Sequence, residues 1–282
     1  MARTPALAWP TFLVGSGYLL LVAWCWFLIL TGRENPWLVI PAIGIGGFYA
    51  LTVVHEAAHG LVSRNRNFNE VFGSLVSATV LPGLTSVYYT WEHNSHHRYL
   101  GQVQDLDTYL FVHPVWARPF TWLVTDYHLA AGYIPVFNSR PRREKMYFYA
   151  AVGTALAIVI AAAFTGHLLD VFLYWFIPSR IALLIYQLLF GYMPHAPGLL
   201  SEQEHGPFAV SKVFTGYERV LTPLLMFQNY HLIHHLIPTV PFYRYGRVWR
   251  HKRDFLIAQG AAVVALRREH SRPPLPSAEP RG

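Results

Sequence analysis

Residues 37–63 read WLVIPAIGIGGFYALTVVHEAAHGLVS. Glu56 is the only acidic or basic residue in this run apart from its histidines, and a bilayer-crossing helix needs roughly 20 apolar residues. His55 and His59 lie four residues apart near the end of the run, which puts both side chains on one helix face. The stretch therefore predicts a membrane-spanning helix that presents two imidazoles to one point at a membrane boundary.

The composition of the whole chain is that of a membrane protein. Of its 282 residues 53% are hydrophobic and 13% charged, against about 25% charged in a typical soluble domain. Three further apolar runs predict spanning helices, at 11–31, at 146–165 and near 179–194, with 168–177 lying at the outer face. We therefore expect an all-α integral membrane protein with four transmembrane helices, forming one domain over residues 1–270 and followed by a disordered tail at 271–282.

The remaining segments set the topology. Residues 70–92 are apolar but broken by Pro82-Gly83, which favours a re-entrant or interfacial hairpin over a crossing. The segments 64–145 and 200–282 hold 19 of the 22 Lys and Arg residues, so the positive-inside rule places both on the cytoplasmic side, most simply at the cell inner membrane. The same rule accounts for the net charge of +7, and nucleic-acid binding is not expected. The single cysteine, Cys25, excludes a disulfide or a cysteine-based metal site within one chain.

Eight of the 15 histidines form three groups with metal-ligand spacing. They are His55 and His59; His93, His96 and His97; and His231, His234 and His235. An even number of predicted spans separates the second group from the third, so all three can meet at the cytoplasmic boundary. A catalytic zinc takes about three protein ligands, whereas two metals with four or five imidazoles each would use the whole set. Imidazole suits iron, copper and zinc, and the sequence does not separate iron from zinc.

In this order among apolar spans, the three groups resemble the histidine boxes of the membrane fatty-acid-desaturase superfamily, over residues 37–255. The resemblance implies four membrane helices, a cytoplasmic histidine-rich cap and a di-iron centre. It also implies the use of O2 and two electrons to attack an unactivated C–H bond. The eight grouped histidines would be iron ligands, and His195, in YMPHAP, would be a ninth.

Three stretches are similar to bacterial β-carotene ring hydroxylases of this superfamily: FQNYHLIHHLIPTVPFYRY (227–245), YMPHAP (192–197) and HHRYLGQVQDLD (96–107). They favour hydroxylation of a carotenoid ring, with a fatty acyl desaturase as the alternative. Two residues depart from desaturase patterns. Glu56 stands where Asp is more common, and Gly191 stands four residues before His195, where acyl desaturases often place Asn.

Two further functions are compatible with the motif alone. His-Glu-x-x-His is also the signature of zinc metalloproteases, with Glu56 as general base. The later spans offer only Asp170 as a third ligand, near the opposite face, and six grouped histidines would stay unexplained. The second alternative is a metal transporter or sensor. Transporters commonly bind their ions near mid-membrane, whereas these histidines are expected at a membrane boundary.

The surroundings of the histidines complete the predictions. A ligating histidine usually donates its other N–H to a carboxylate or carbonyl, and the candidate acceptors are Glu56, Glu92, Asp105, Asp107 and Asn229. No flavin, nicotinamide or haem motif is present in the sequence, so electrons would come from a separate ferredoxin or cytochrome. A basic patch near the third group would dock that donor, bind anionic lipid or anchor the cap; it comprises Arg244, Arg247, Arg250, Lys252 and Arg253. The residues that bind the lipid substrate are not predicted.

Overall fold

The structure is a computed structural model that describes residues 5–266. Four helices in this part of the chain are long and apolar enough to cross a membrane: α1 (Trp9–Leu30), α2 (Pro36–Ala58), α8 (Arg142–Thr165) and a continuous helix, Leu168–His195. They confirm the all-α membrane fold with four spans. The predicted domain limit at 270 and the tail at 271–282 lie outside the described residues.

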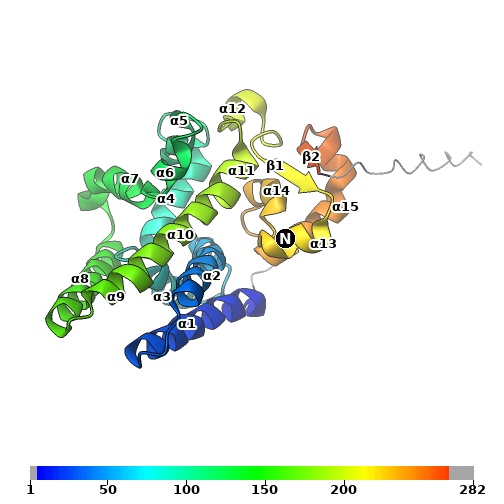
Figure 1. Cartoon of the computed structure of the whole chain (residues 1–282). Helices are drawn as coiled ribbons and strands as arrows, with labels where there is room; N and C mark the ends of the chain where they lie inside the picture. The colour runs from blue at the N-terminus through cyan, green and yellow to red at the C-terminus, as the bar shows by residue number, and fades with distance from the viewer. Residues whose placement is uncertain (1–4, 267–282) are drawn as a thin grey trace, which may run out of the picture.

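Shorter elements connect and cover the spans (Figure 1). They are α3 (Arg66–Val80), α4 (Ser86–Tyr99), α5 (Tyr109–Val112), α6 (Arg118–Trp122), α7 (Thr125–Tyr133), α12 (Glu202–His205), β1 (Lys212–Thr215), α13 (Glu218–Leu224), α14 (His231–Leu236), α15 (Tyr245–Ala258) and β2 (Ala262–Ala265). One-turn 3-10 helices include η1 (Leu106–Thr108), η5 (Gln228–Tyr230) and η6 (Phe242–Arg244).

Helix α2 is the central helix of the bundle. The Asn35 side chain accepts a hydrogen bond from the Trp37 amide at 3.0 Å, which caps the first turn. Further along, an added Cβ at Gly44 would lie 2.8 Å from Ile181, and one at Gly47 would lie 2.7 Å from Ala182. The glycines thus let the fourth span approach closely, as small residues do between membrane helices.

The fourth span corrects one prediction. Residues 168–177 do not form a separate segment at the outer face. Instead, α9 (Leu168–Val171), the π-helical turn η3 (Phe172–Phe176), α10 (Ile177–Tyr186), a second π-helical turn η4 (Gln187–Tyr192) and α11 (Met193–His195) make one helix. Pro178 predicts a break in the helix because proline lacks the backbone N–H. The wide π-helical turn before it accommodates the missing donor, and the helix continues.

The Pro-Gly break produces the predicted helical hairpin. Helices α3 and α4 have 15 and 14 residues, too short to cross a bilayer alone. They turn at Pro82-Gly83, where Gly83 has φ +82°. Helix α3 packs closely on α2: an added Cβ at Gly73 would lie only 2.6 Å from Ala57. The hairpin therefore brings α4, with the second histidine group, beside α2.

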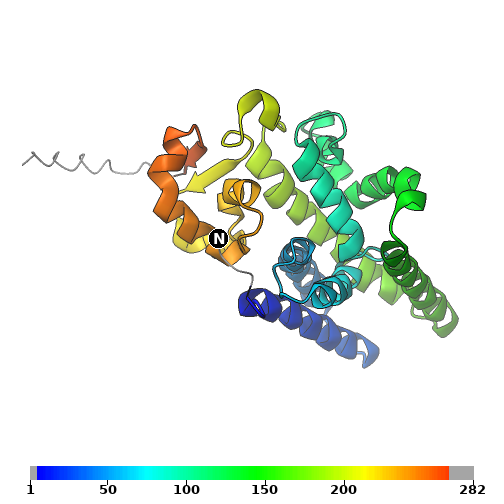
Figure 2. The ribbon, with the colours of Figure 1, turned by 180° about the vertical axis from the view of Figure 1, so that it is seen from behind.

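The segments after the fourth span gather at one end of the bundle, beside the start of α1 (Figures 1 and 2). Strands β1 and β2 pair in parallel, with Lys212 opposite Ala262 and Thr215 opposite Ala265. No sequence pattern predicted these strands. Their pairing fixes α13, α14 and α15 between them as a cap over the histidine-bearing end of the spans.

A buried ion pair holds the segment after α4 against the fourth span. Arg180 donates to both carboxylate oxygens of Asp126 at 2.8 and 2.6 Å and to the Leu123 carbonyl at 2.7 Å. The two side chains are only 12% and 9% exposed.

Replacing Asp126 with alanine is expected to destabilise the protein by about 3–5 kcal/mol, because it leaves the largely buried Arg180 without its counter-charge. The melting temperature in detergent measures the effect. Asp170→Ala is the matched control: it breaks the more exposed His167–Asp170 pair and should cost only about 0–1 kcal/mol. Equal melting temperatures for the two variants would contradict the assignment.

Candidate metal centre

The structure brings the nine predicted histidines together at one end of the spans. His55 and His59 lie at the end of α2, and His195 ends the fourth span. The others lie on the inner face of α4 and on α14: His93, His96, His97, His231, His234 and His235. Their ring nitrogens form two adjacent groups.

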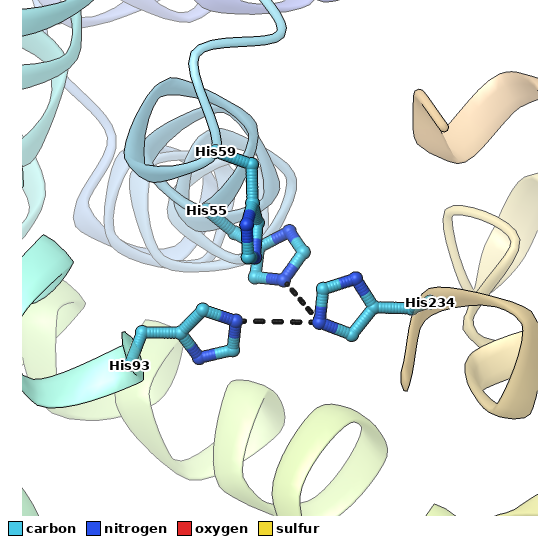
Figure 3. A group of neighbouring side chains, drawn as sticks. All are labelled: His55, His59, His93 and His234. Carbon is cyan, nitrogen blue, oxygen red and sulfur yellow. Dashed lines mark hydrogen bonds between the residues drawn. The ribbon is translucent and has the colours of Figure 1, made fainter. Parts of the chain in front are cut away.

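The first group contains His55, His59, His93 and His234, whose ligand atoms all lie within 4.8 Å of one another (Figure 3). The Nε2 atom of His234 is at its centre, 3.1 Å from Nε2 of His55 and 3.3 Å from that of His93. His97 joins from the side, with its Nε2 2.8 Å from the same nitrogen of His234. The Nε2 atom of His59 is buried and has no hydrogen-bond partner.

Hydrogen bonding alone does not account for this convergence. A ring nitrogen offers either one N–H or one lone pair, yet three other Nε2 atoms approach Nε2 of His234. Nitrogens that bind one ion at about 2.0–2.1 Å lie roughly 3.0–3.4 Å apart. The spacing of 2.8–3.3 Å and the unpartnered nitrogen of His59 therefore fit a shared metal ion.

The second group contains His96, His195 and His235, again with ligand atoms within 4.8 Å. The Nε2 atoms of His195 and His235 are 3.2 Å apart. The His231 ring lies beside them, with its centroid 5.2 Å from that of His195 and 4.8 Å from that of His235. The residues thus fit two neighbouring metal ions, with His97 between the groups.

The Nδ1 atoms of four of the histidines bind protein acceptors, which turns their Nε2 atoms inward. His96 Nδ1 donates to Asp105 at 3.1 Å and lies 3.3 Å from Asp107. These two carboxylates thus lie beside a histidine ring nitrogen, as predicted. Three more acceptors come from outside the histidine groups. His195 Nδ1 donates to the Val210 carbonyl at 2.9 Å, His231 Nδ1 to Gln228 Oε1 at 2.7 Å, and His234 Nδ1 to the Tyr245 hydroxyl at 3.2 Å.

Burial keeps most of these imidazoles neutral, the form that binds metal. Burial, and then the neighbouring histidines, lower the pKa of His234 and His235 well below the usual value, and lower that of His97 to about 2. His96 is different. Burial acts to lower its pKa, but the Asp105 and Asp107 carboxylates outweigh burial and raise the pKa to about 9. The metal-free His96 ring therefore holds a proton on both nitrogens near neutral pH, and a metal ion that binds Nε2 would displace the proton there while Nδ1–H stays bonded to Asp105.

The other predicted acceptors do not reach a ring nitrogen. Glu56 Oε2 accepts the Phe242 amide at 3.2 Å, and its Oε1 lies 3.7 Å from His55 Nδ1, beyond hydrogen-bonding distance. Asn229 donates to Thr222 Oγ1 at 3.2 Å and so holds the turn before α14. Glu92 pairs with Asp107; burial, and then this second carboxyl group, raise the pKa of Glu92.

Sequence reasoning missed Gln228, Tyr245 and the Val210 carbonyl. Gln228 precedes His231 by three residues, a helical spacing that could have indicated it. Tyr245 comes from α15, and Val210 lies 15 residues beyond His195, so tertiary structure alone brings them to the site.

Replacing Gln228 with leucine is expected to weaken metal binding about 10- to 100-fold, because His231 loses the acceptor that fixes its tautomer and orientation. Metal retained after a chelator challenge measures the effect. Gln203→Leu, on the exposed face of α12, is the control and should retain as much metal as the wild type. Equal retention in the two variants would show that the Gln228 contact is dispensable.

Fold and site together define a membrane protein with a histidine-rich centre that fits two metal ions. A family model described as Fatty acid desaturase matches residues 34–267. This match covers most of the chain, and the protein therefore belongs to the fatty acid desaturase family. Membership makes it a membrane oxidoreductase of the desaturase and hydroxylase superfamily, as the histidine groups predicted. None of the curated proteins matches the chain.

Proposed function

We propose that this protein is an O2-dependent di-iron hydroxylase that acts on the ring of a β-carotene-type carotenoid. Two iron ions, when bound, would supply the activation of O2 and the oxidation of the C–H bond. The overall change is R–H + O2 + 2 e⁻ + 2 H⁺ → R–OH + H2O. A separate one-electron carrier, a ferredoxin or a cytochrome, would provide the electrons.

The observation that carries the proposal is the pair of adjacent imidazole groups. The first group would hold one ion through His55, His59, His93 and His234, and the second another through His96, His195 and His235. Asp105, Gln228 and Tyr245 keep rings of both groups in their ligating orientation. An all-nitrogen ligand set is compatible with iron and unlike the oxygen sites of magnesium or calcium.

A small cavity beside the histidines supports a reaction at the metal centre. It measures ≈ 30 Å³, touches His93, His96, His195 and His231, and is walled by Tyr186, Phe190 and Gly191. This is room for one small molecule such as water. Most of the residues that line it are buried, and limited access of water protects a reactive oxidising step from side reactions.

Gly191 favours hydroxylation over acyl desaturation. An added Cβ there would lie 2.6 Å from Leu110 Cδ1 and 2.9 Å from Gln187 Oε1. The asparagine that acyl desaturases often place at this position would not fit without movement of Leu110. The three resembling stretches and the glycine at this position support a carotenoid substrate, and the acyl desaturase remains the second candidate.

The site disfavours a zinc protease and a metal transporter. In a zinc protease Glu56 would face the metal-bound water, but its Oε2 accepts the Phe242 amide and its side chain is fully buried. The histidines gather at one end of the spans, whereas a transporter commonly binds its ion near mid-membrane. The distribution of basic residues supports a cytoplasmic site at the cell inner membrane.

Expression in a bacterial host that accumulates β-carotene tests the proposal. We expect hydroxylated carotenoid, an unchanged fatty-acid profile and about two irons per purified chain. A new double bond in the acyl chains, with carotene intact, would replace the proposal with acyl desaturation. One zinc per chain together with peptide hydrolysis would establish the protease instead.

A further inference from the structure

Helix α4 has two faces of opposite character. His93, His96 and His97 point inward to the metal centre. Trp91, Asn94, Ser95, Arg98 and Tyr99 have the spacing of the opposite face and, with Arg140, line a hollow of ≈ 470 Å³. The wall between this hollow and the metal ligands is a single helix, roughly 10–12 Å across with its side chains.

A second hollow adjoins the first. It measures ≈ 480 Å³ and shares Trp91, Asn94 and Arg140 with it. Its lining also includes Gly60, which follows His59 directly, and the basic residues Arg64 and Arg66. We call the two hollows together the α4 groove. It lies among the ends of α2, α3, α4 and α8, at the end of the bundle that carries the histidines.

The α4 groove carries excess positive charge. Arg64, Arg66 and Arg98 are exposed along it, and Arg142 and Arg143 are exposed at the adjoining start of α8. The two acidic residues of the lining are already neutralised. Glu70 bonds Arg66 at 2.8 Å and Arg143 at 2.6 Å, and Glu144 bonds Arg140 at 2.8 Å. A partner with negative charge is therefore the electrostatic complement of this surface.

We propose that the α4 groove is the docking surface for a small acidic one-electron carrier protein. This inference rests on the proposed function, because it names where the two electrons of each turnover enter. Two reduced carrier molecules would dock in turn. Each would transfer one electron to the metal centre and dissociate in its oxidised form. These two electrons, with two protons from water, complete the reduction of O2 to the hydroxyl oxygen of the product and one water.

The groove offers a more direct route to the metal ligands than the predicted basic patch on α15. Arg98 is joined to His97 by one peptide bond, and His97 is only half-buried. Helix α15 carries none of the nine histidines. It contacts one of them through the hydrogen bond between Tyr245 and His234 Nδ1. The α4 groove is also concave, so a protruding cofactor edge of the carrier could approach α4.

The test compares two double variants that remove the same charge from the two surfaces. Arg66→Glu with Arg98→Gln alters the α4 groove, and Arg247→Glu with Lys252→Gln alters the patch on α15. An acidic [2Fe–2S] ferredoxin is the probe. Its Kd is measured on the nanodisc-embedded protein, iron-loaded and metal-stripped, across a salt series. Substrate oxidation is measured with reduced ferredoxin and, separately, with a small chemical reductant.

We expect the α4 groove variant to raise Kd roughly tenfold at low salt, with the difference shrinking as salt screens the charges. Its oxidation should fall with ferredoxin and stay near wild type with the chemical reductant. The patch variant should bind within about twofold of wild type.

Equal weakening in both variants, weakening in the patch variant alone, or no weakening would each overturn the docking proposal. So would a wild-type protein that oxidises substrate with the chemical reductant but does not bind ferredoxin. No oxidation with either reductant would instead count against the proposed function.

Discussion

Replacing His234 with alanine is expected to reduce bound iron from about two per chain to one or none, and oxidation to background. The reason is the central place of its Nε2 atom, which three other histidine Nε2 atoms approach within 3.3 Å. Loss of this ring opens the first group and leaves the buried nitrogens of His55 and His93 without a common partner.

Metal analysis of the purified variant and product formation in a β-carotene-producing host measure the two effects. His205→Ala is the matched control, since His205 is exposed on α12 and outside both groups. The control should keep wild-type iron and activity. Two irons and full activity in His234→Ala would refute the assignment of this ring as a ligand.

The second large effect is expected at Asp105. This buried carboxylate accepts His96 Nδ1 at 3.1 Å, the Gly101 amide at 3.1 Å and the Asp107 amide at 3.0 Å. Asp105→Ala removes all three acceptor contacts at once. We expect metal affinity to fall about 10- to 100-fold and oxidation to fall with it, because His96 loses the group that orients it and raises its basicity.

Asp105→Asn separates orientation from charge. The asparagine oxygen can still accept the His96 N–H, so this variant should lose less metal than Asp105→Ala in a chelator titration. Asp254→Asn, at an exposed position of α15, is the control for a change of charge alone. A ranking in which Asp105→Asn equals Asp105→Ala would show that charge matters more than orientation, and wild-type retention in both would contradict the role of Asp105.

The spans and the histidine groups could be predicted because their signals are local. Hydropathy over about 20 residues defines a membrane helix, and spacings of three and four put ligands on one face. The Pro82-Gly83 turn was equally local, since proline and glycine punctuate helices directly. The meeting of all three groups at one boundary then followed from counting crossings.

Other features depend on contacts that no local pattern contains. Pro178 predicted a break, yet the fourth span continues because a π-helical turn compensates. Strands β1 and β2 are short and lie far apart in the chain, so only the folded cap brings them together. The partners Tyr245 and Val210 were missed for the same reason, and Asn229 proved to contact Thr222 rather than a ring nitrogen.

The second π-helical turn, η4, lies directly before His195 and has a consequence for the register of the chain. A π-helical turn contains one residue more than an α-helical turn, and each residue of an α-helix adds a rotation of about 100°. If residues 187–192 were wound as regular α-helix without a change in length, the extra residue would rotate the following turn by about 100° and swing His195 away from His96 and His235. The direction of the ninth histidine thus depends on the winding of the turn before it, and not on its own position in the chain alone.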